Sequence, residues 1–277
     1  MEERTRFELI ALGTGTCVSG LGWEKEERWP PGYLLKGIAH KLVLLEASEG
    51  IRYRIQDAKE EYTNVSDILV SHLHPDHFNL VPFVQSIAIK QSWSRGKFKR
   101  SSLRIFGPKG IEVDFWKIWK IQVPEHPKSI YGLLKLEFIE LSDNKSINFY
   151  HSQLTAFNVF HALDKITALA FRLKTAEGVF TYSGDSGLCP GLEKAADKTD
   201  VFLCDASADI GDDKSKTSGH LNPFQAGSLA DRIGVKKLWL THYSGKNSPE
   251  EMIANCKSAG FGGEIRVLRD GDRLFPF

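Results

Sequence analysis

The sequence predicts an α+β fold in which two β-sheets pack together with helices on the outside. Two observations predict it. Short apolar runs rich in β-branched and aromatic residues recur along the chain, and fewer helical stretches lie between them. A strand-rich first half ends in a helix, and a second strand-rich half ends in helices. That order is typical of a layered sandwich, whose edge loops would carry the chemistry.

The individual elements follow from run length and turn signals. The expected strands are Phe7–Leu12, Lys41–Leu45, Ile68–Val70, Leu103–Phe106, Leu136–Leu141, Leu154–Phe160, Ala168–Leu173, Gly178–Tyr182, Val201–Cys204, Lys237–Leu240 and Ile265–Leu268. The expected helices are Leu80–Lys90, Ile111–Ile121, Pro223–Arg232 and Ser248–Ala259. Ser248 and Asn222 each precede a proline and are expected to cap the last two helices.

Composition indicates an ordinary globular protein without a global electrostatic preference. Of the 277 residues, 42% are apolar and 26% are charged, and 36 basic residues balance 35 acidic ones. Such a charge balance disfavours nucleic acid or a membrane surface as a general partner, although a local patch would suffice. We expect one domain over residues 1–277. The absence of a long apolar run and of a signal-peptide core near Met1–Arg6 predicts a cytoplasmic protein without membrane spans.

The four cysteines are Cys17, Cys189, Cys204 and Cys256, and they are widely separated in sequence. Because no two of them form a C-x-x-C pair, neither a thiolate zinc site nor a disulfide framework is indicated. We expect them to be buried small apolar residues or residues without a functional role.

The most informative segment is His72-Leu-His74-Pro-Asp76-His77, directly after a short apolar strand. Residues two apart in extended backbone point the same way, so His72 and His74 can serve one metal ion. Asp76 and His77 follow where Pro75 turns the chain, and they can serve a neighbouring ion. Imidazole and carboxylate ligands suit zinc, or iron and manganese. An exposed His-rich loop is the alternative.

Three further candidate ligands lie far away in the sequence, namely His161, Asp185 and His242. Each would be a weak signal alone, because a single histidine at a strand end is more often a surface residue than a ligand. All three follow an apolar strand, as His72 does, and this shared placement supports them together. His151 competes with His161, and we favour His161 because a strand leads into it.

These motifs together resemble the metallo-β-lactamase superfamily. The resemblance spans nearly the whole chain, from Leu12–Thr16 after the first strand to the Leu-Thr-His that ends in His242. Three departures stand out. Glu46 occupies a position that is usually aspartate in the family, Ser48 one that is often glycine, and Pro75 one that is commonly glycine or alanine. The family aspartate shapes the metal loop rather than binding metal, so we expect Glu46 to keep that role.

The resemblance implies a four-layer αβ/βα sandwich with two divalent metal ions, zinc or else manganese or iron. It also implies a water or hydroxide between the ions as the nucleophile, with its pKa lowered toward neutrality. The implied ligands fall into two groups that share one bridging residue. They are His72, His74 and His161 for the first ion, Asp76, His77 and His242 for the second, and Asp185 for both.

The segment between Asp185 and His242 resembles the branch that contains ribonuclease Z and the phosphoribosyl cyclic-phosphate phosphodiesterases. In that branch an acidic residue after a strand orients a histidine, as Asp205 and His220 could do here. Such a histidine can donate a proton to a leaving alkoxide. The candidate catalytic residues are therefore Asp76, His220 and Asp205. The alternative is that His220 only caps the helix that begins at Pro223.

The short segment between His161 and Asp185 favours a small substrate. Transfer-RNA nucleases of this branch carry a long arm between the third histidine and the bridging aspartate, whereas His161 and Asp185 are too close for one. We expect a phosphodiesterase for a small, cyclic or nucleotide-like phosphodiester or an RNA end, with transfer RNA a weaker candidate. A lactonase or other carboxylic or thioester hydrolase and a non-catalytic metal-binding scaffold are the alternatives. A homodimer is compatible with the family.

An insertion at about 91–131 is also expected. It begins with the basic and aromatic run Trp93–Arg100, which could contact phosphates but is more typical of a solvated connection. Trp116 and Trp119 on the following helix are expected to belong to the core rather than to a lid.

Overall fold

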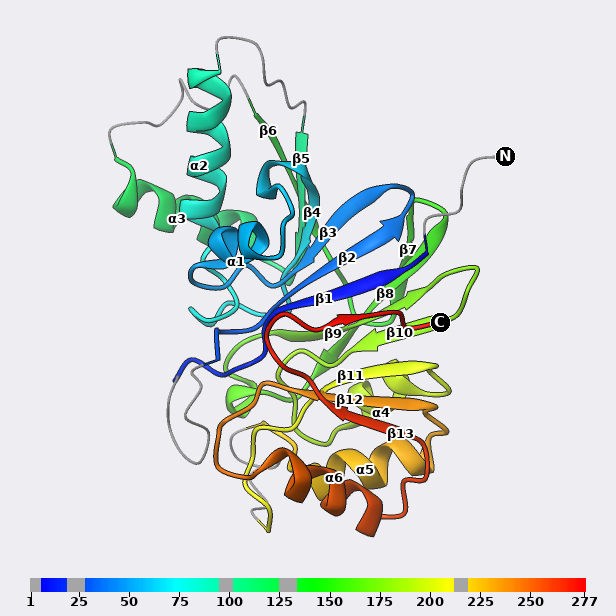
Figure 1. The fold of residues 1–277 in the computed structure, drawn as a ribbon. Coiled ribbons are helices and arrows are strands. Elements are labelled where there is room, and N and C mark those ends of the chain that lie inside the picture. Colours follow the sequence, from blue (N-terminus) through cyan, green and yellow to red (C-terminus); the bar gives the residue numbers. More distant parts are fainter. Residues whose placement is uncertain (1–5, 19–27, 95–101, 125–133, 212–218) are drawn as a thin grey trace.

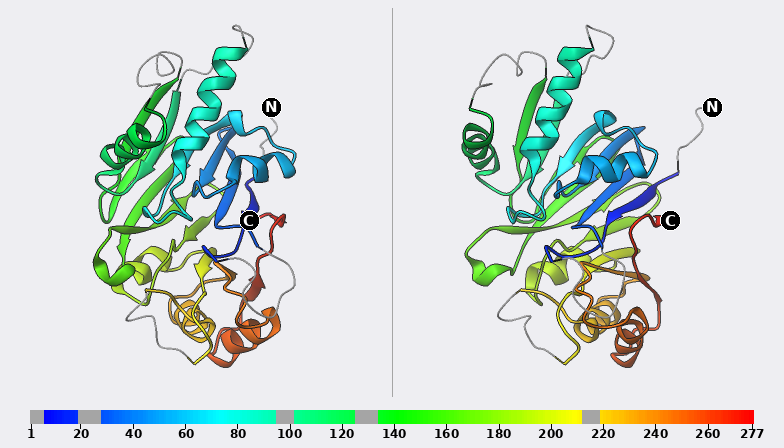
Figure 2. Two further views of the ribbon diagram at one scale, coloured as in Figure 1. Left: turned by 90° about the vertical axis from the view of Figure 1, so that its left-hand side faces the viewer. Right: turned by 60° about the vertical axis from the view of Figure 1, so that its left-hand side comes forward.

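Two seven-stranded β-sheets lie between two layers of helices in the computed structural model (Figure 1). The structure describes residues 6–18, 28–94, 102–124, 134–211 and 219–277. Figure 2 shows the helices of the first and second halves of the chain on opposite sides of the sheets. The protein is therefore a four-layer αβ/βα sandwich, as the sequence predicted.

The first sheet has the strand order β14-β1-β2-β3-β4-β5-β6. Strands β3, β4, β5 and β6 run parallel to one another, while β2 is antiparallel to both of its neighbours. The strands are β1 (Glu8–Gly13), β2 (Gly32–Ile38), β3 (Lys41–Leu45), β4 (Val65–Leu69), β5 (Ser102–Gly107), β6 (Lys135–Glu140) and β14 (Arg273–Leu274).

The second sheet has the order β13-β12-β11-β10-β9-β8-β7. Strands β10 to β13 are parallel, and β9 is antiparallel to β8 and β10, so β8 and β10 run in the same direction. The strands are β7 (Lys145–Phe149), β8 (Ser152–Val159), β9 (Ala168–Lys174), β10 (Val179–Tyr182), β11 (Val201–Asp205), β12 (Lys237–Thr241) and β13 (Glu264–Val267).

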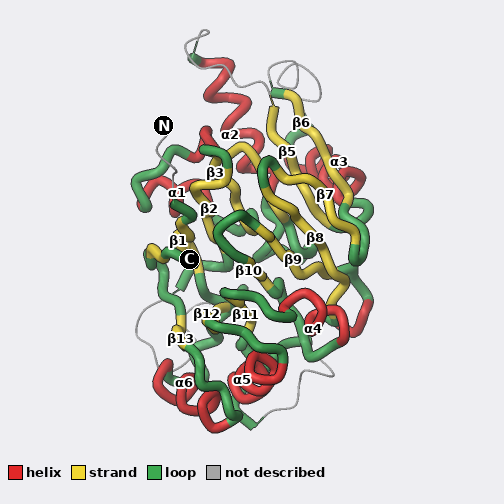
Figure 3. The backbone as a smooth tube through the Cα atoms, turned by 90° about the vertical axis from the view of Figure 1, so that its right-hand side faces the viewer, coloured by secondary structure: helices red, strands yellow, loops and turns green. Residues whose placement is uncertain are grey.

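Helices cover the outer face of each sheet, as Figure 3 shows for α5 and α6 beside β11 to β13. The described helices are α1 (Ile51–Asp57), α2 (Leu80–Trp93), α3 (Ile111–Gln122), α4 (Pro190–Ala196), α5 (Pro223–Arg232) and α6 (Pro249–Ser258), with the short 3₁₀ turns η1 (Tyr62–Asn64) and η3 (Ala162–Asp164). Asn222 and Ser248 cap α5 and α6 in full capping boxes, which confirms both predicted caps.

Strand β1 shows how the layers are built from the sequence. Leu9 and Ala11 face the core between the two sheets, whereas Ile10 and Leu12 face the helices of the first half. Successive side chains of a strand point to opposite faces, so a strand covered on both sides is apolar at every position. A third core lies between the second sheet and helices α4 to α6.

The runs predicted as strands and helices all form the expected element, with ends shifted by a few residues. Strands β2, β7 and β14 and helices α1 and α4 were not predicted. Strand β7 is largely polar and exposed, and both missed helices have only seven residues, so their periodic signal is weak.

The segment expected as an insertion contains β5 and α3, which are built into the first sheet and its helical cover. Trp119 is 2% exposed and Trp116 packs against the same core, which confirms their predicted place. Most of the basic run, residues 95–100, lies outside the described residues.

Cys204 and Cys256 are buried, as expected, whereas Cys17 is exposed and Cys189 half-buried. All four cysteines are free, which agrees with the absence of a predicted disulfide framework. Among the described residues, no helix is both long enough and apolar enough to cross a membrane.

Candidate metal centre

The carboxyl ends of neighbouring strands bring the candidate residues to one edge of the sandwich. Strands β10, β11 and β12 are parallel neighbours, and Asp185, Asp205 and His242 lie at or just after their ends. Strand β8 runs in the same direction and leads to His161, while β4 leads from the other sheet to His72. Topology therefore gathers side chains that are far apart in sequence.

Unusual backbone conformations direct these segments toward the site. His242 and Glu46 follow directly after β12 and β3 and have φ angles of 56° and 62°, in the left-handed region. Gly184 has φ 57°, and a Cβ there would lie 2.6 Å from the carbonyl oxygen of Leu169 and 2.9 Å from Cβ of Ser71. Only glycine fits at this position. Left-handed backbone at non-glycine residues is costly and is concentrated at functional sites.

One group of four side chains converges at the first half of the site. His72, His74, His161 and Asp185 each offer a ligand atom, and these atoms lie within 4.8 Å of one another. His161 Nε2 and His74 Nδ1 are 3.1 Å apart. Asp185 Oδ2 lies 3.9 Å from His72 Nε2 and 3.8 Å from His161 Nε2.

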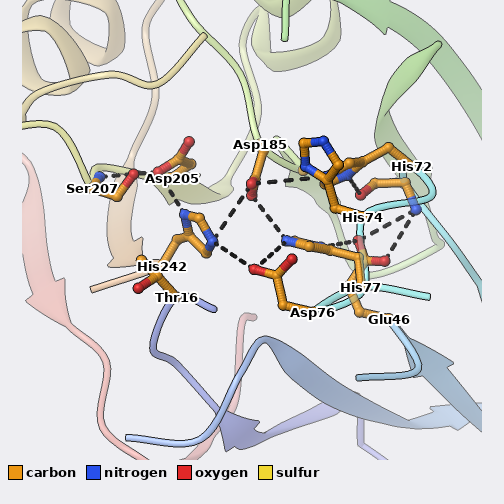
Figure 4. A network of polar contacts seen from close by, with 12 residues as sticks. Thr16, Glu46, His72, His74, Asp76, His77, Asp185, Asp205, Ser207 and His242 are labelled. Carbon is orange, nitrogen blue, oxygen red and sulfur yellow. Dashed lines mark hydrogen bonds and ion pairs between the residues drawn. The ribbon is translucent and has the colours of Figure 1, made fainter. Parts of the chain in front are cut away.

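A second group lies next to the first and shares Asp185 with it. Asp76, His77 and His242 also offer ligand atoms within 4.8 Å of one another. Asp185 lies 3.3 Å from His77 Nε2 through Oδ1 and 3.5 Å from His242 Nε2 through Oδ2. Figure 4 shows Asp185 between the two groups. The structure thus brings together all seven residues that the sequence singled out as ligands.

The outer nitrogens of His72 and His161 are held by hydrogen bonds, and that of His77 faces a buried carboxylate. His72 Nδ1 contacts the Ser71 hydroxyl at 2.9 Å, and His161 Nδ1 donates to the carbonyl of Gly219 at 3.1 Å. His77 Nδ1 lies 3.5 Å from Glu46, whose carboxylate also accepts the Ser71 N–H. Such contacts fix the ring and leave Nε2 directed at the centre.

Of these orienting groups, the sequence indicated only Glu46. Ser71 is adjacent to a ligand, but nothing in its pattern distinguishes it. Gly219 has φ 76°, and a Cβ there would lie 2.5 Å from His161 Cα, a requirement visible only in three dimensions. Asp205 was expected to orient His220, yet it also lies 3.4 Å from His242 Nδ1.

The unpaired inner nitrogens fit divalent metal ions. Within the described residues, the Nε2 atoms of His72, His77 and His242 are buried and have no hydrogen-bond partner. A buried polar atom without a partner is costly, and a metal ion would satisfy each of these nitrogens. The donor set of imidazoles and carboxylates suits zinc, manganese or iron.

The electrostatics of the cluster point the same way. Burial opposes the charged form of His77, but the carboxylates of Asp185 and Glu46 outweigh it and raise its pKa to about 10. Burial and the neighbouring His77 lower the pKa of His72. Burial opposes ionisation of Asp185, yet His242 and His77 lower its pKa. The cluster thus holds positive charge around a buried carboxylate, a role that metal ions can take over from protons.

His220 forms a pair with Asp205 at the border of the cluster, and both residues also offer ligand atoms within 4.8 Å of those of Asp185 and His242. His220 Nδ1 lies 2.6 Å from Asp205 Oδ2, and its ring lies 4.9 Å from that of His161 and 5.3 Å from that of His242 between centroids. Burial disfavours the imidazolium form, but Asp205 outweighs it and raises the pKa of His220. The cap of α5 is Asn222, so His220 is not its capping residue.

Two other histidines lie away from the cluster. His151 is an exposed residue in the turn between β7 and β8, and it lines a separate cavity together with His40. The geometry therefore places His161, rather than His151, among the converging side chains. His126 lies outside the described residues.

The family follows from a match of the β-lactamase superfamily domain model to residues 42–243. The chain belongs to this superfamily. The matched region includes every side chain of the two groups, and the resemblance predicted from the motifs is confirmed.

Relatives and solved structures agree with this assignment. An uncharacterised protein of Mycobacterium tuberculosis is 27% identical over 248 residues, which cover 86% of this chain and 82% of that protein. A ribonuclease Z of Ignicoccus hospitalis is 24% identical over 290 residues and covers 88% and 89% of the two chains.

Three solved structures share the fold over nearly the whole chain. YhfI of Bacillus subtilis, a metallo-β-lactamase fold protein, has a TM-score of 0.79 at 16% identity and covers 98% and 99% of the two chains. The short form of human tRNase Z has a TM-score of 0.72 at 20% identity, and the match covers 98% of this chain and 100% of that chain. A diphosphatase of the PhnP family has a TM-score of 0.72 at 17% identity, and the match covers 97% of each chain. The chain is a metal-dependent hydrolase of this superfamily.

Proposed function

We propose that this chain is a dinuclear metal-dependent phosphodiesterase that acts on a small or cyclic phosphodiester. The observation that carries the proposal is the Asp205–His220 pair, with its 2.6 Å contact, beside two groups of converging ligand atoms that share Asp185. The similarity to a ribonuclease Z and to the fold of a PhnP-family diphosphatase supports the same reaction class.

The proposed ligand sets follow the two groups of side chains. His72, His74 and His161 would hold one ion and Asp76, His77 and His242 the other, while Asp185, which lies close to members of both groups, would serve both ions. When bound, two divalent cations neutralise phosphate charge and make water a competent nucleophile near neutral pH. Zinc is the first candidate, because imidazole-rich sites suit it well.

His220 is proposed to supply the proton that the leaving alkoxide needs. Asp205 is 1% exposed and fixes the His220 ring through Nδ1, whereas the side chain of His220 is 21% exposed. Asp205 thus fixes the Nδ1 side of the His220 ring, and the rest of the ring remains partly accessible to solvent at the border of the cluster. A carboxylate-oriented imidazole with a raised pKa is well suited to donate a proton.

The chain between His161 and Asp185 supports a small substrate. It is occupied by η3, β9 and β10 and their turns, all of them described, and holds nothing that could form a long arm. This part of the chain therefore lacks the long arm that the resemblance associates with transfer-RNA binding. Lactonase activity is the main competing outcome.

The experiment is a substrate panel on protein loaded with zinc or manganese. Bis-p-nitrophenyl phosphate and a cyclic phosphodiester are compared with a lactone, a thioester and a precursor transfer RNA. We expect the highest kcat/KM for the phosphodiesters. Preference for the lactone or thioester would replace the proposed reaction class, and preference for the transfer RNA would overturn the small-substrate assignment.

A further inference from the structure

A cavity of about 500 Å³ opens beside the metal cluster and touches it at Asp76. Its walls come from the stretch that runs from the metal loop at Leu73 into the start of α2 at Val81, from the end of α3, and from Cys17, Pro30 and Glu49. The volume lies within the range of small-ligand pockets, about 300 to 1,000 Å³. Apart from Asp76, none of the residues that line the cavity belongs to the proposed ligands.

The lining is apolar with a few polar groups. Leu73, Phe78 and Leu80 form one side, and Ile118 and Ile121 of α3 form another. Ile121 is 79% exposed, which is unusual for a large aliphatic side chain on a helix that already buries Ile111, Phe115 and Trp119. An exposed apolar wall next to a polar reaction centre is typical of a substrate pocket.

The charges of the cavity disfavour a second phosphate. Glu49 and Asp76 both line it, and no lysine or arginine among the described residues does. A phosphate-binding groove requires basic side chains or free backbone N–H groups to compensate the charge. The amides of Asn79 and Gln122 also line the cavity and can recognise the polar edge of a ring.

We propose that this cavity binds an uncharged aromatic group of nucleobase size on the phosphodiester substrate, so that the enzyme selects nucleoside or aryl phosphodiesters over polyanions. This inference rests on the proposed phosphodiesterase activity. The cavity reaches the metal cluster at Asp76. His220 contacts a different part of the cluster, next to the rings of His161 and His242. A substrate with its leaving group at His220 therefore directs the ester group that stays on phosphorus into the cavity.

The test compares two diesters that release the same leaving group, p-nitrophenolate. One is the thymidine 5′ ester and the other is the methyl ester. We expect the holoenzyme to favour the thymidine ester in kcat/KM by at least about tenfold, within the usual range for an apolar pocket. Ile121→Asp should lower kcat/KM for the thymidine ester several-fold more than for the methyl ester, and so remove most of this preference.

A matched control lies on the same helix. Val113 is 56% exposed and does not line the cavity, so Val113→Asp should keep the preference of the native enzyme. Ile118→Trp, which fills the cavity, serves as a second variant if Ile121→Asp fails to fold. Equal use of the two diesters by the native enzyme would overturn the inference, as would an unchanged preference in the folded cavity variants.

A readout without turnover separates this inference from the proposed function. Cys17 lines the cavity, whereas Cys189 does not. Thymidine alone should slow the alkylation of Cys17 by iodoacetamide and leave Cys189 unaffected, as mass spectrometry would show. Protection of Cys17 without hydrolysis of either diester would contradict the phosphodiesterase activity alone. Hydrolysis of both without protection or preference would contradict the cavity assignment alone.

A substrate with a second phosphate tests whether the acidic lining of the cavity disfavours added negative charge. A thymidine diester with the same leaving group and an added 3′-phosphate should be used less well than the parent, and Glu49→Gln should narrow the difference several-fold because one carboxylate is removed. Equal use of both substrates by the native enzyme would show that the cavity accepts polyanions.

Discussion

Asp205 contacts two imidazoles with different tasks, and this makes it the most informative single residue of the site. Its Oδ2 meets His220 at 2.6 Å, and its Oδ1 lies 3.4 Å from His242 Nδ1. It also accepts the N–H groups of Ser186 and Ser207, so its position is fixed from the backbone. One carboxylate therefore orients both a proposed proton donor and a proposed metal ligand.

Removing His220 should separate catalysis from metal binding. We expect His220→Ala to keep its metal content and to lose about 10²- to 10⁴-fold in turnover, the usual contribution of a positioned acid or base. Elemental analysis and kcat measured on one preparation test this. Loss of metal from this variant would instead assign His220 to the ligands.

Changing Asp205 should affect both tasks. Asp205→Asn weakens the orientation of His242 as well as that of His220, so we expect lower turnover together with a metal affinity reduced by about 10- to 100-fold. A metal titration alongside kinetics at saturating metal separates the two effects. Unchanged metal affinity would show that the contact with His242 is incidental.

At the scale of elements, a buried ion pair connects strands of the first sheet to a turn of the second. Asp67 on β4 is fully buried and pairs with Arg104 on β5 at 2.5 Å. It also accepts the hydroxyl of Tyr150, in the turn between β7 and β8, at 2.6 Å. The guanidinium lies 4.7 Å from the centre of the Tyr150 ring. This network links β4 and β5 of the first sheet to the β7–β8 turn of the second sheet.

Breaking this pair should destabilise the fold without touching the site. We expect Arg104→Met to lower the free energy of unfolding by about 2–3 kcal/mol. Loss of a fully buried partner typically costs more, but the Arg104 side chain is 28% exposed. Lys117→Met is the control, because its pair with Asp114 is exposed and should contribute less than about 0.5 kcal/mol. Denaturant unfolding measures both, and equal losses would refute the argument.

The elements also show what sequence can and cannot predict here. Apolar runs such as Val201–Cys204 are strands covered on both faces, so their signal is continuous and their ends mark the site. The ligands were recognisable because they follow such runs. Glu46 was indicated only through the family resemblance. The carbonyl of Gly219, which holds His161, depends on left-handed backbone and on a contact across the sandwich, which no local pattern encodes. The cavity was missed for the same reason.

On the scale of the whole molecule, the proposed metal ligands come from both halves of the sandwich. His72, His74, Asp76 and His77 follow β4 of the first sheet. The other proposed ligands follow β8, β10 and β12 of the second sheet and complete both groups around Asp185. Bound ions would therefore cross-link the sheets at this edge, where histidine nitrogens without partners otherwise face one another.

This placement predicts a global response to metal. Ions that bind only the folded state stabilise it by about 2.7 kcal/mol at a free concentration of 100 Kd, which corresponds to a rise in Tm of roughly 5–10 °C for a domain of this size. We expect zinc to raise the Tm of chelator-treated protein by such an amount. Asp185→Asn should remove most of the shift, because Asp185 contacts both groups. Calorimetry of both proteins with and without zinc tests this. A full shift in the variant would show that the ions bind elsewhere and that the two sheets do not share a centre.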